Sequence, residues 1–353
     1  MVIKGAVLNV IRATGGFELM RYAHRRQPLI LTYHRFSQGE EPDRTPAAAF
    51  AEQLDYLAAH YEVVPLGELV ARMNASESRP GGGKGLAAIT IDDGYRDSYE
   101  IAYPLLRQRN LPAMVYVVTK FADGHCWIWT DKARYLCARA ESQWLTTRIG
   151  GQESWLELGD AASRRRTALR LNDLLKKLPE EAKESALERL AETLGVPLPA
   201  TPPEELRSIT WEQAREMDRN GVEIGSHTMT HPILTNIQEE QLRRELAGSR
   251  RQLEEILERE VTQFCYPNGD NDVRVQREVA QAGYRIAVTT VSGLNKRGDD
   301  PLTLRRIHTE RDLAHFLQST SGFEQMKEKA RNFIKRTATP GAMMALRSAD
   351  QNR

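Results

Sequence analysis

The chain has 353 residues, of which 41% are hydrophobic and 27% are charged, proportions that are ordinary for a globular protein. Its 49 Lys and Arg residues against 48 Asp and Glu residues give a formal net charge of +1. This balance argues against a nucleic-acid-binding protein that works through bulk positive charge. The length suits one large α/β domain or two smaller domains.

Cysteine usage and hydropathy indicate where the protein works. Cys126, Cys137 and Cys265 are few, odd in number and without C-x-x-C spacing, which indicates free thiols in a reducing compartment. No apolar run approaches the roughly 20 residues that a membrane-spanning helix needs. Charges and glycines interrupt residues 1–27, so a signal-peptide core is not expected there. We expect a cytoplasmic protein in which 1–27 is an N-terminal helical segment, with peripheral membrane contact as the alternative.

Strand-like and helix-like patterns alternate along most of the chain. Helices are expected over 67–73, 97–109, 209–221, 238–260 and 272–283, and over 45–60 with Thr45 as N-cap and Pro46 at the first position. Repeated βα units imply a parallel sheet, and we expect a (β/α) barrel that is closed or nearly so. Chemistry in such barrels gathers at the carboxyl ends of the strands. The expected strands are 28–34, 61–66, 86–93, 112–119, 222–227, 261–267, 284–290 and 302–309.

Residues 127–205 interrupt this alternation. The segment is charged and helix-rich, and we expect a helical insertion that covers or flanks the site. The barrel then comprises 28–126 and 206–320, and 321–353 forms a C-terminal helix and tail.

Two carboxylates stand where a buried strand stops. The apolar run Ala87 to Ile91 ends in Asp92, Asp93 and Gly94. Adjacent carboxylates repel each other, and desolvating them is costly unless something positive lies beside them. A charged surface turn is the simpler interpretation of Asp-Asp-Gly taken alone.

Two histidines four residues apart, His227 and His231, follow another apolar strand. On a turn of helix this spacing would put both rings on one side, as two-histidine metal sites require, although isolated pairs are more often ordinary hydrogen-bonded histidines. Both clusters close βα-type strands and so belong on the same rim of the barrel. We therefore expect a shared metal, with one aspartate as ligand and the other as base beside it.

The motifs carry a family resemblance. The stretches "ITIDDGYRDSYE" and "GSHTMTH" resemble the Asp-Asp-Gly and His-Ser/Thr-x-x-His motifs of the polysaccharide deacetylase (NodB-homology, carbohydrate esterase) family, with looser matches at "LILTYHRF", "FCYPNGDND" and "LTLRRI". Order and spacing resemble the branch that works on amino-sugar polymers in exopolysaccharide systems. The resemblance covers about 29–309. It implies a distorted barrel of about seven strands, a divalent metal (usually zinc, with Co²⁺, Ni²⁺ or Fe²⁺ as alternatives) and hydrolysis of N-acetyl groups on N-acetylhexosamine residues.

The resemblance also implies roles for individual residues. It assigns Asp92 as general base, and Asp93, His227 and His231 as metal ligands. The reaction needs an acid for the leaving amine. The family's late histidine motif is poorly matched here, so we predict His34, at the end of the first strand, with His308 as second choice.

One position departs from the family pattern, and the oxyanion donor and the substrate-binding residues are predicted separately. Cys265 stands where the third motif often carries an arginine that holds the base; Arg306 is the predicted replacement and Arg305 its alternative. The loop after Cys265 is predicted to offer a backbone N–H to the oxyanion. The predicted substrate-binding residues are Tyr266, Pro267, Asn268, Tyr95 and Trp129, with Asp131 beside Trp129. Trp129 fits the core beneath the insertion equally well.

The leading functional prediction is a metal-dependent deacetylase of N-acetylhexosamine-containing glycans, in exopolysaccharide or the cell envelope, that releases acetate. A small-molecule C–N amidohydrolase of the same fold is one alternative. A glycan-binding homologue with an impaired site is another. An iron oxygenase is disfavoured because such enzymes usually have antiparallel jelly-roll folds. The expected partner is a glycan, not nucleic acid.

Overall fold

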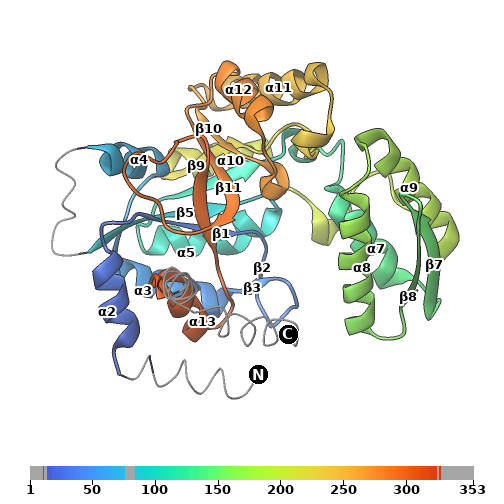
Figure 1. Ribbon diagram of the computed structural model, residues 1–353, viewed down its shortest axis with the longest axis horizontal. Helices are drawn as coiled ribbons and strands as arrows, with labels where there is room; N and C mark the ends of the chain where they lie inside the picture. Colours follow the sequence, from blue (N-terminus) through green and yellow to red (C-terminus); the bar gives the residue numbers. More distant parts are fainter. Residues whose placement is uncertain (1–10, 12–13, 76–83, 324–325, 327–353) are drawn as a thin grey trace, which may run out of the picture.

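A closed barrel of parallel strands forms the centre of the molecule (Figure 1). The computed structural model describes residues 11, 14–75, 84–323 and 326. Seven strands form the ring, in the order β1-β12-β11-β10-β9-β6-β5, and pairing of β1 with β5 closes it. This confirms the predicted barrel of about seven strands. The ring strands are β1 (Leu29–Tyr33), β5 (Gly85–Ile91), β6 (Ala113–Val117), β9 (Val222–Ser226), β10 (Gln263–Cys265), β11 (Ile286–Ser292) and β12 (Leu304–His308).

Helices cover the outside of the ring, and β4 (Tyr61–Val63) adds an eighth strand beside β5. Every residue of β1, β5 and β6 is buried, because these strands face packed side chains on both sides. The covering helices are α2 (Gly16–His24), α3 (Ala47–His60), α4 (Leu66–Asn74), α5 (Tyr103–Gln108), α6 (Thr119–Ala122), α10 (Trp211–Arg219), α11 (Glu239–Leu257), α12 (Val273–Gln281) and α13 (Leu313–Thr320).

Two helix starts differ from the prediction. Thr45 is not an N-cap: it pairs with Phe36 in the small sheet of β2 (Phe36–Ser37) and β3 (Thr45–Pro46), so Pro46 takes the cap position and α3 begins at Ala47. The predicted helix 97–109 starts as a π-helical turn, Ser98–Ala102, before α5. Pro104 has no N–H for the regular helical bond, which accounts for the irregular start.

The insertion has its own hydrophobic core and lies beside the barrel (Figure 1). It contains α7 (Trp129–Arg139), α8 (Ala161–Leu175) and α9 (Glu180–Leu194). It also contains an antiparallel hairpin that the sequence prediction missed, β7 (Trp144–Ile149) and β8 (Gln152–Glu157). Gly150 and Gly151, both with positive φ, form the two-residue turn that such a hairpin favours.

The ends of the chain are only partly described. Of the predicted N-terminal segment the structure describes mainly α2, and of the predicted tail 321–353 only residues 321–323 and 326. Among the described residues, no helix combines the length and apolar character needed to cross a bilayer. The three cysteines are free.

Candidate active site

The Asp-Asp-Gly and histidine motifs meet at the carboxyl ends of β5 and β9, which flank β6 in the ring. The Asp92 amide donates to the Tyr33 carbonyl at 2.9 Å, which extends the β5–β1 pairing by one residue. Asp93 and Gly94 then both have positive φ, 73° and 74°. A Cβ on Gly94 would lie 3.1 Å from the Val117 side chain, so both the conformation and the close approach require glycine. This bend separates the directions of the two carboxylates.

Asp92 forms a bidentate ion pair with Arg306. Its Oδ1 and Oδ2 accept from Nη1 and Nη2 of the guanidinium, each at 2.7 Å. Both side chains are buried. Burial alone would raise the pKa of Asp92, but Arg306 outweighs it and lowers the pKa to about 2. Asp92 is therefore ionised at neutral pH.

The remaining Arg306 donors also have partners. Nε donates to the Thr289 carbonyl at 2.8 Å, Nη1 to Thr90 Oγ1 at 3.0 Å, and Nη2 lies 3.3 Å from Cys265 Sγ. A fully buried ion pair is tolerated only when its hydrogen bonds are satisfied in this way. Arg306 thus extends from β12 alongside Cys265 to Asp92. Arg305, the alternative, is exposed, and its Nη1 lies 3.8 Å from Asp299 Oδ2.

Asp93, His227 and His231 converge on one point. The Nε2 atoms of His227 and His231 lie 3.4 and 3.5 Å from Asp93 Oδ1. Two ligands of a tetrahedral zinc, each about 2.1 Å from the ion, are about 3.4 Å apart. His227 Nδ1 is 2.7 Å from the Cys265 carbonyl oxygen, which makes Nδ1 the protonated nitrogen and leaves the Nε2 lone pair for a cation. The donor set therefore fits a divalent metal.

The spacing of His227 and His231 predicts a turn of helix, but the structure has a non-helical loop there, which we call the histidine loop. Thr228 and His231 have positive φ, 69° and 62°, and the regular 3-10 turn starts only at Leu234. The buried Glu245 of α11 holds the loop: Oε2 accepts from the Met229 and Thr230 amides at 2.8 and 3.0 Å. The His231 amide donates to Thr228 Oγ1 at 3.0 Å. These bonds bring both rings to one side without a helix.

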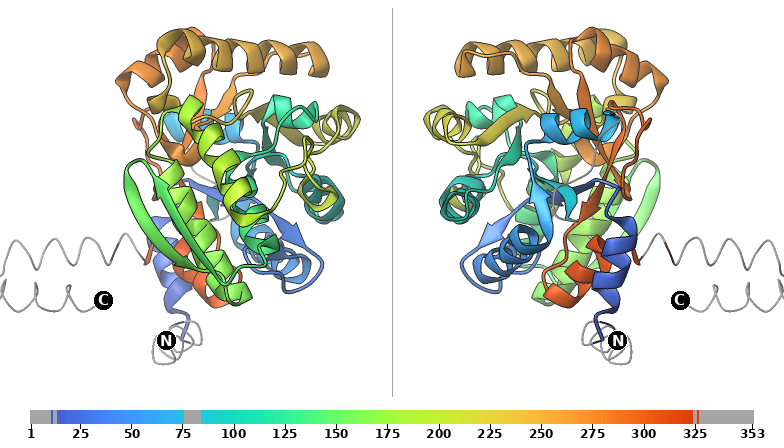
Figure 2. Two further views of the ribbon diagram at one scale, coloured as in Figure 1. Left: turned by 90° about the vertical axis from the view of Figure 1, so that its right-hand side faces the viewer. Right: turned by 90° about the vertical axis from the view of Figure 1, so that its left-hand side faces the viewer.

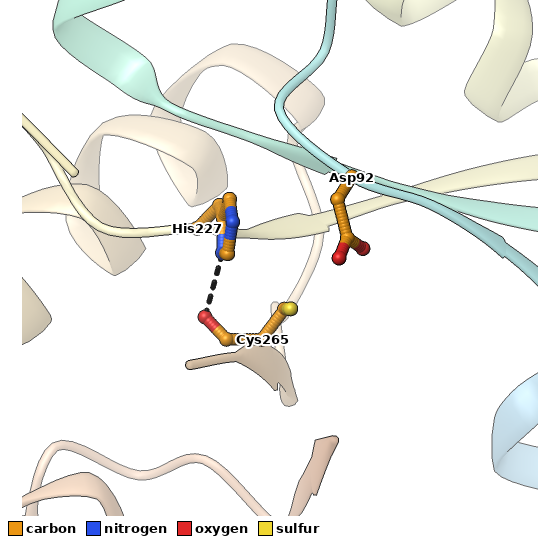
Figure 3. Close-up of side chains that lie close together, drawn as sticks. All are labelled: Asp92, His227 and Cys265. Carbon is orange, nitrogen blue, oxygen red and sulfur yellow. Dashed lines mark hydrogen bonds between the residues drawn. The ribbon is translucent and has the colours of Figure 1, made fainter. Parts of the chain in front are cut away.

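A second cluster, Asp92, His227 and Cys265, also offers potential ligand atoms (Figure 3). This cluster suits a cation poorly, because both Asp92 oxygens already accept hydrogen bonds from the positively charged Arg306, which would repel a second cation. The His227 nitrogen nearest Cys265 is engaged with the Cys265 carbonyl. Burial raises the pKa of the Cys265 thiol, which disfavours the thiolate that a metal binds. The Asp93 cluster is the better metal site.

Without a cation, the Asp93 cluster shifts the pKa values of its two histidines in opposite directions: Cys265 and Asp93 outweigh burial and raise the pKa of His227 well above its usual value. Burial opposes ionisation of Asp93, but the two histidines outweigh it and lower its pKa. Burial and the neighbouring His227 lower the pKa of His231 to about 3, so this ring is neutral at pH 7. His231 Nδ1 is buried without a hydrogen-bond partner among the described residues.

The two candidate acids lie on adjacent strands. His34 follows β1, has a 44% exposed side chain and places Nε2 3.7 Å from Asp92 Oδ2. His308 ends β12 and pairs with Thr32 across the β1 register. Burial, His34 and Arg306 lower the pKa of His308. The geometry therefore favours His34 as the residue that could carry a proton beside Asp92.

The loop after β10 has few free donors. The Tyr266 and Gly269 amides donate to the Val288 and Tyr266 carbonyls at 3.2 and 2.8 Å, and Pro267 has no N–H. In the described part of the chain, the backbone N–H of Asn268 makes no hydrogen bond to another backbone group. Tyr266 itself is buried and its hydroxyl donates to the Leu302 carbonyl at 2.9 Å, so its side chain belongs to the core rather than to a substrate surface.

Tyr95 and Trp129 are also buried, contrary to their predicted place along a sugar groove. The Tyr95 hydroxyl donates to Asp131 Oδ2 at 2.5 Å, and the Arg35 guanidinium lies 3.9 Å from the Tyr95 ring centroid. Trp129 packs in the insertion core with Lys183 Nζ 4.3 Å from its ring centroid. The Tyr95–Asp131 hydrogen bond joins the Asp-Asp-Gly turn to α7 of the insertion.

Sequence reasoning missed Glu245. A signal for it exists: in α11 it shares the buried face with Leu242, Leu246 and Ser249. A glutamate at a core-facing helix position needs a polar partner, and here the partner is the histidine loop.

Comparison with known proteins places these motifs in a family context. A sequence profile of the polysaccharide deacetylase family matches residues 80–287. YxkH of Bacillus subtilis (strain 168), a protein assigned to the polysaccharide deacetylases, is 21% identical over 279 residues, 79% of this chain and 70% of YxkH.

Two solved structures share the fold. The deacetylase PplD of Streptococcus pyogenes, solved with acetate, superposes with a TM-score of 0.56 at 18% identity and covers 84% of this chain and 98% of its own. IcaB from Ammonifex degensii has the same TM-score, 0.56, and identity, 18%, and covers 84% and 97% of the two chains.

Proposed function

This chain belongs to the polysaccharide deacetylase family, and from that premise we propose that it is a metal-dependent deacetylase of N-acetylhexosamine-containing glycans. Members of the family are hydrolases that act on N-acetyl amides. Metal dependence and the glycan substrate are our proposal.

One observation carries the proposal: two adjacent carboxylates have different partners. Asp92 is paired with Arg306 at 2.7 Å, whereas Asp93 Oδ1 faces the Nε2 atoms of His227 and His231 at 3.4 and 3.5 Å. Metal-assisted hydrolysis needs a cation that activates the substrate and the water, and also a base that does not itself bind that cation. The strand-end bend at Asp93 and Gly94 supplies this separation.

Asp93, His227 and His231 would hold the cation, most readily zinc, with Co²⁺, Ni²⁺ or Fe²⁺ as alternatives. A bound divalent cation would polarise the acetyl carbonyl and lower the pKa of the attacking water. Asp92 accepts the proton of that water. Arg306 orients the Asp92 carboxylate for this transfer and keeps it ionised.

The amine must leave protonated, and His34 is the proposed donor. Its ring is partly exposed on the rim and lies next to Asp92, 3.7 Å from Oδ2. The backbone N–H of Asn268 is the proposed oxyanion donor from the β10 loop. Arg306 supports the Asp92 carboxylate without contacting the substrate, and is a positioning residue.

The substrate we propose is an exopolysaccharide or cell-envelope glycan rather than a small cyclic amide. Sequence resemblance to the exopolysaccharide branch supports this choice. Cytoplasmic location and peripheral membrane contact remain predictions, for which fractionation of cells producing the full chain is the test.

Acetate release from N-acetylglucosamine oligomers by the zinc-loaded protein tests the proposal. We expect release that stops in Asp92→Asn while zinc is retained, because Asp92 lies outside the ligand set. Zinc-loaded protein that releases no acetate from any N-acetylated glycan would contradict the proposed function. Persistent turnover by Asp92→Asn would contradict the assignment of the base.

A further inference from the structure

Two tryptophans are exposed and stacked on the outer face of the β7–β8 hairpin. Trp144 is 44% exposed and Trp155 is 66% exposed. Their ring centroids are 3.9 Å apart and their planes differ by 4°. Trp144 pairs with Glu157 and Trp155 with Thr146, so the two rings are diagonal neighbours across the strands. Each ring covers one face of the other, and both side chains remain exposed to solvent over much of their surface.

The hairpin is fixed in this orientation by its inner face. Leu145 and Ile149 are buried in the insertion core, and Leu156 packs against it. Because side chains alternate along a strand, a slip of one residue would expose these aliphatic side chains and bury the tryptophans. The outward direction of Trp144 and Trp155 is therefore built into the register.

The other side chains of the outer face are polar. Thr146, Arg148, Glu153 and Glu157 are all exposed, and with the two tryptophans they make up what we call the Trp face. A sugar ring has an apolar C–H face and a rim of hydroxyl groups. Open indole faces next to hydroxyl, guanidinium and carboxylate groups complement both parts of such a ring.

The size of the Trp face disfavours a folded protein partner. Two strands of six residues are about 20 Å long and about 10 Å wide, so the face offers about 200 Å², against about 800 Å² per partner in a stable protein interface. Its charges also disfavour a membrane: Arg148 and Arg166, the latter 3.6 Å from Glu157, only balance the two glutamates, so the face has no excess of basic residues to attract an anionic lipid surface. A narrow linear ligand that is rich in hydroxyl groups fits best.

We propose that the Trp face is a second glycan-binding surface that holds an extended stretch of polymer away from the catalytic rim. This rests on the proposed function. Figures 1 and 2 show β7 and β8 on the side of the insertion that faces away from the barrel. A polymer held there increases the effective concentration of its other units at the active site, whereas an oligomer too short to reach both places gains nothing.

The test compares long and short glycans on the full chain. Binding is measured by affinity electrophoresis with two soluble polymers, glycol chitin and a β-1,6-linked poly-N-acetylglucosamine, and acetate release is measured with an N-acetylglucosamine trimer. We expect Trp144→Ala and Trp155→Ala each to weaken binding of at least one polymer fivefold or more. Activity on the trimer should stay within twofold of wild type. Trp155→Tyr should restore most of the binding. Val273→Ala, at an 80% exposed valine on α12, is the matched control and should change neither readout.

Polymer binding that is absent in wild type, or equal in wild type and both alanine variants, would overturn the proposal. So would tryptophan-dependent sedimentation with phosphatidylserine vesicles, or a tryptophan-dependent dimer in sedimentation velocity, if polymer binding were unchanged. Failure of the proposed function gives a different pattern: no acetate release from the trimer by any variant. Tryptophan-dependent polymer binding would still support the Trp face in that case.

Discussion

Arg306 shows how one side chain can determine the ionisation of a buried carboxylate, that of Asp92. Asp92 is buried, and without a cation its pKa would rise. The bidentate pair at 2.7 Å reverses this effect, and the Thr289, Thr90 and Cys265 contacts keep the guanidinium in place. Asp92 can then act as a base over the whole physiological pH range.

Replacing Arg306 should therefore shift the pH profile. In Arg306→Met the pKa of Asp92 rises, so the acidic limb of kcat/KM moves to higher pH and the value at pH 7 falls about 100-fold or more. Arg306→Lys keeps the charge but loses the bidentate geometry, and should recover only part of the activity. Arg305→Met is the matched control. An unchanged profile in Arg306→Met would show that Arg306 does not support the base.

The same ion pair contributes to stability in a pH-dependent way. A carboxylate whose folded pKa is depressed stabilises the fold above its unfolded pKa, and this contribution is lost as pH falls through the folded pKa. For Asp92 the pKa falls from 3.8 to about 2, so about 2 kcal/mol present above pH 4 should be lost between about pH 4 and pH 2.

Urea unfolding of metal-free protein at several pH values measures this loss. Wild type should be more stable than Asp92→Asn at pH 6, because the variant leaves Arg306 buried without its counter-ion. The difference between their free energies of unfolding should become smaller toward pH 2. A difference independent of pH would contradict the ion-pair account.

At the scale of elements, the histidine loop is shaped by α11. Glu245 accepts from the Met229 and Thr230 amides and from Thr230 Oγ1, the last at 2.7 Å. It touches no ligand, yet it fixes the segment between His227 and His231. Its effect on a metal should resemble that of other groups that orient ligands.

Glu245→Gln should weaken zinc binding about tenfold, and Glu245→Ala more strongly, since supporting residues of metal ligands typically contribute 10- to 100-fold in affinity. Competition with a zinc chelator measures this change. Glu240→Gln, at an exposed glutamate on the same helix, is the control and should bind zinc as wild type does. Equal affinities in all variants would mean that the loop holds its shape without Glu245.

The elements that periodicity specifies strongly were predictable from the sequence. The barrel strands and the long helices 238–260 and 272–283 follow alternation and amphipathic spacing, which burial dictates. The β7–β8 hairpin was missed because its flanking helices dominate the composition, although the Gly150–Gly151 turn marks it. Thr45 was misplaced because strand pairing with Phe36 overrides its capping preference. No local pattern specifies the left-handed backbone of the histidine loop, which is supported by Glu245, 14 residues beyond His231, through the Met229 and Thr230 amides.

For the whole molecule, the proposed metal site joins elements that are far apart in the sequence. Asp93 follows β5, whereas His227 and His231 follow β9, and the insertion lies between them in the chain. A cation shared by these elements binds the folded protein and not the unfolded chain, so it should stabilise the native state.

Zinc at 100 times its dissociation constant should add about 2.7 kcal/mol to the free energy of unfolding. Thermal unfolding with and without zinc measures this effect as a higher Tm, which a chelator should reverse. His231→Ala should lose most of the increase, whereas Asp92→Asn should keep it. An equal zinc-dependent rise in Tm for wild type and His231→Ala would place the stabilising zinc elsewhere.

The position of the cation is the most direct test. Anomalous diffraction from zinc-loaded crystals, recorded at the zinc absorption edge, should give one strong peak within about 2.0–2.2 Å of Asp93 Oδ, His227 Nε2 and His231 Nε2, with Asp92 still paired to Arg306. A peak among Asp92, His227 and Cys265, or a peak remote from both clusters, would contradict the assignment of Asp93 as metal ligand and Asp92 as base.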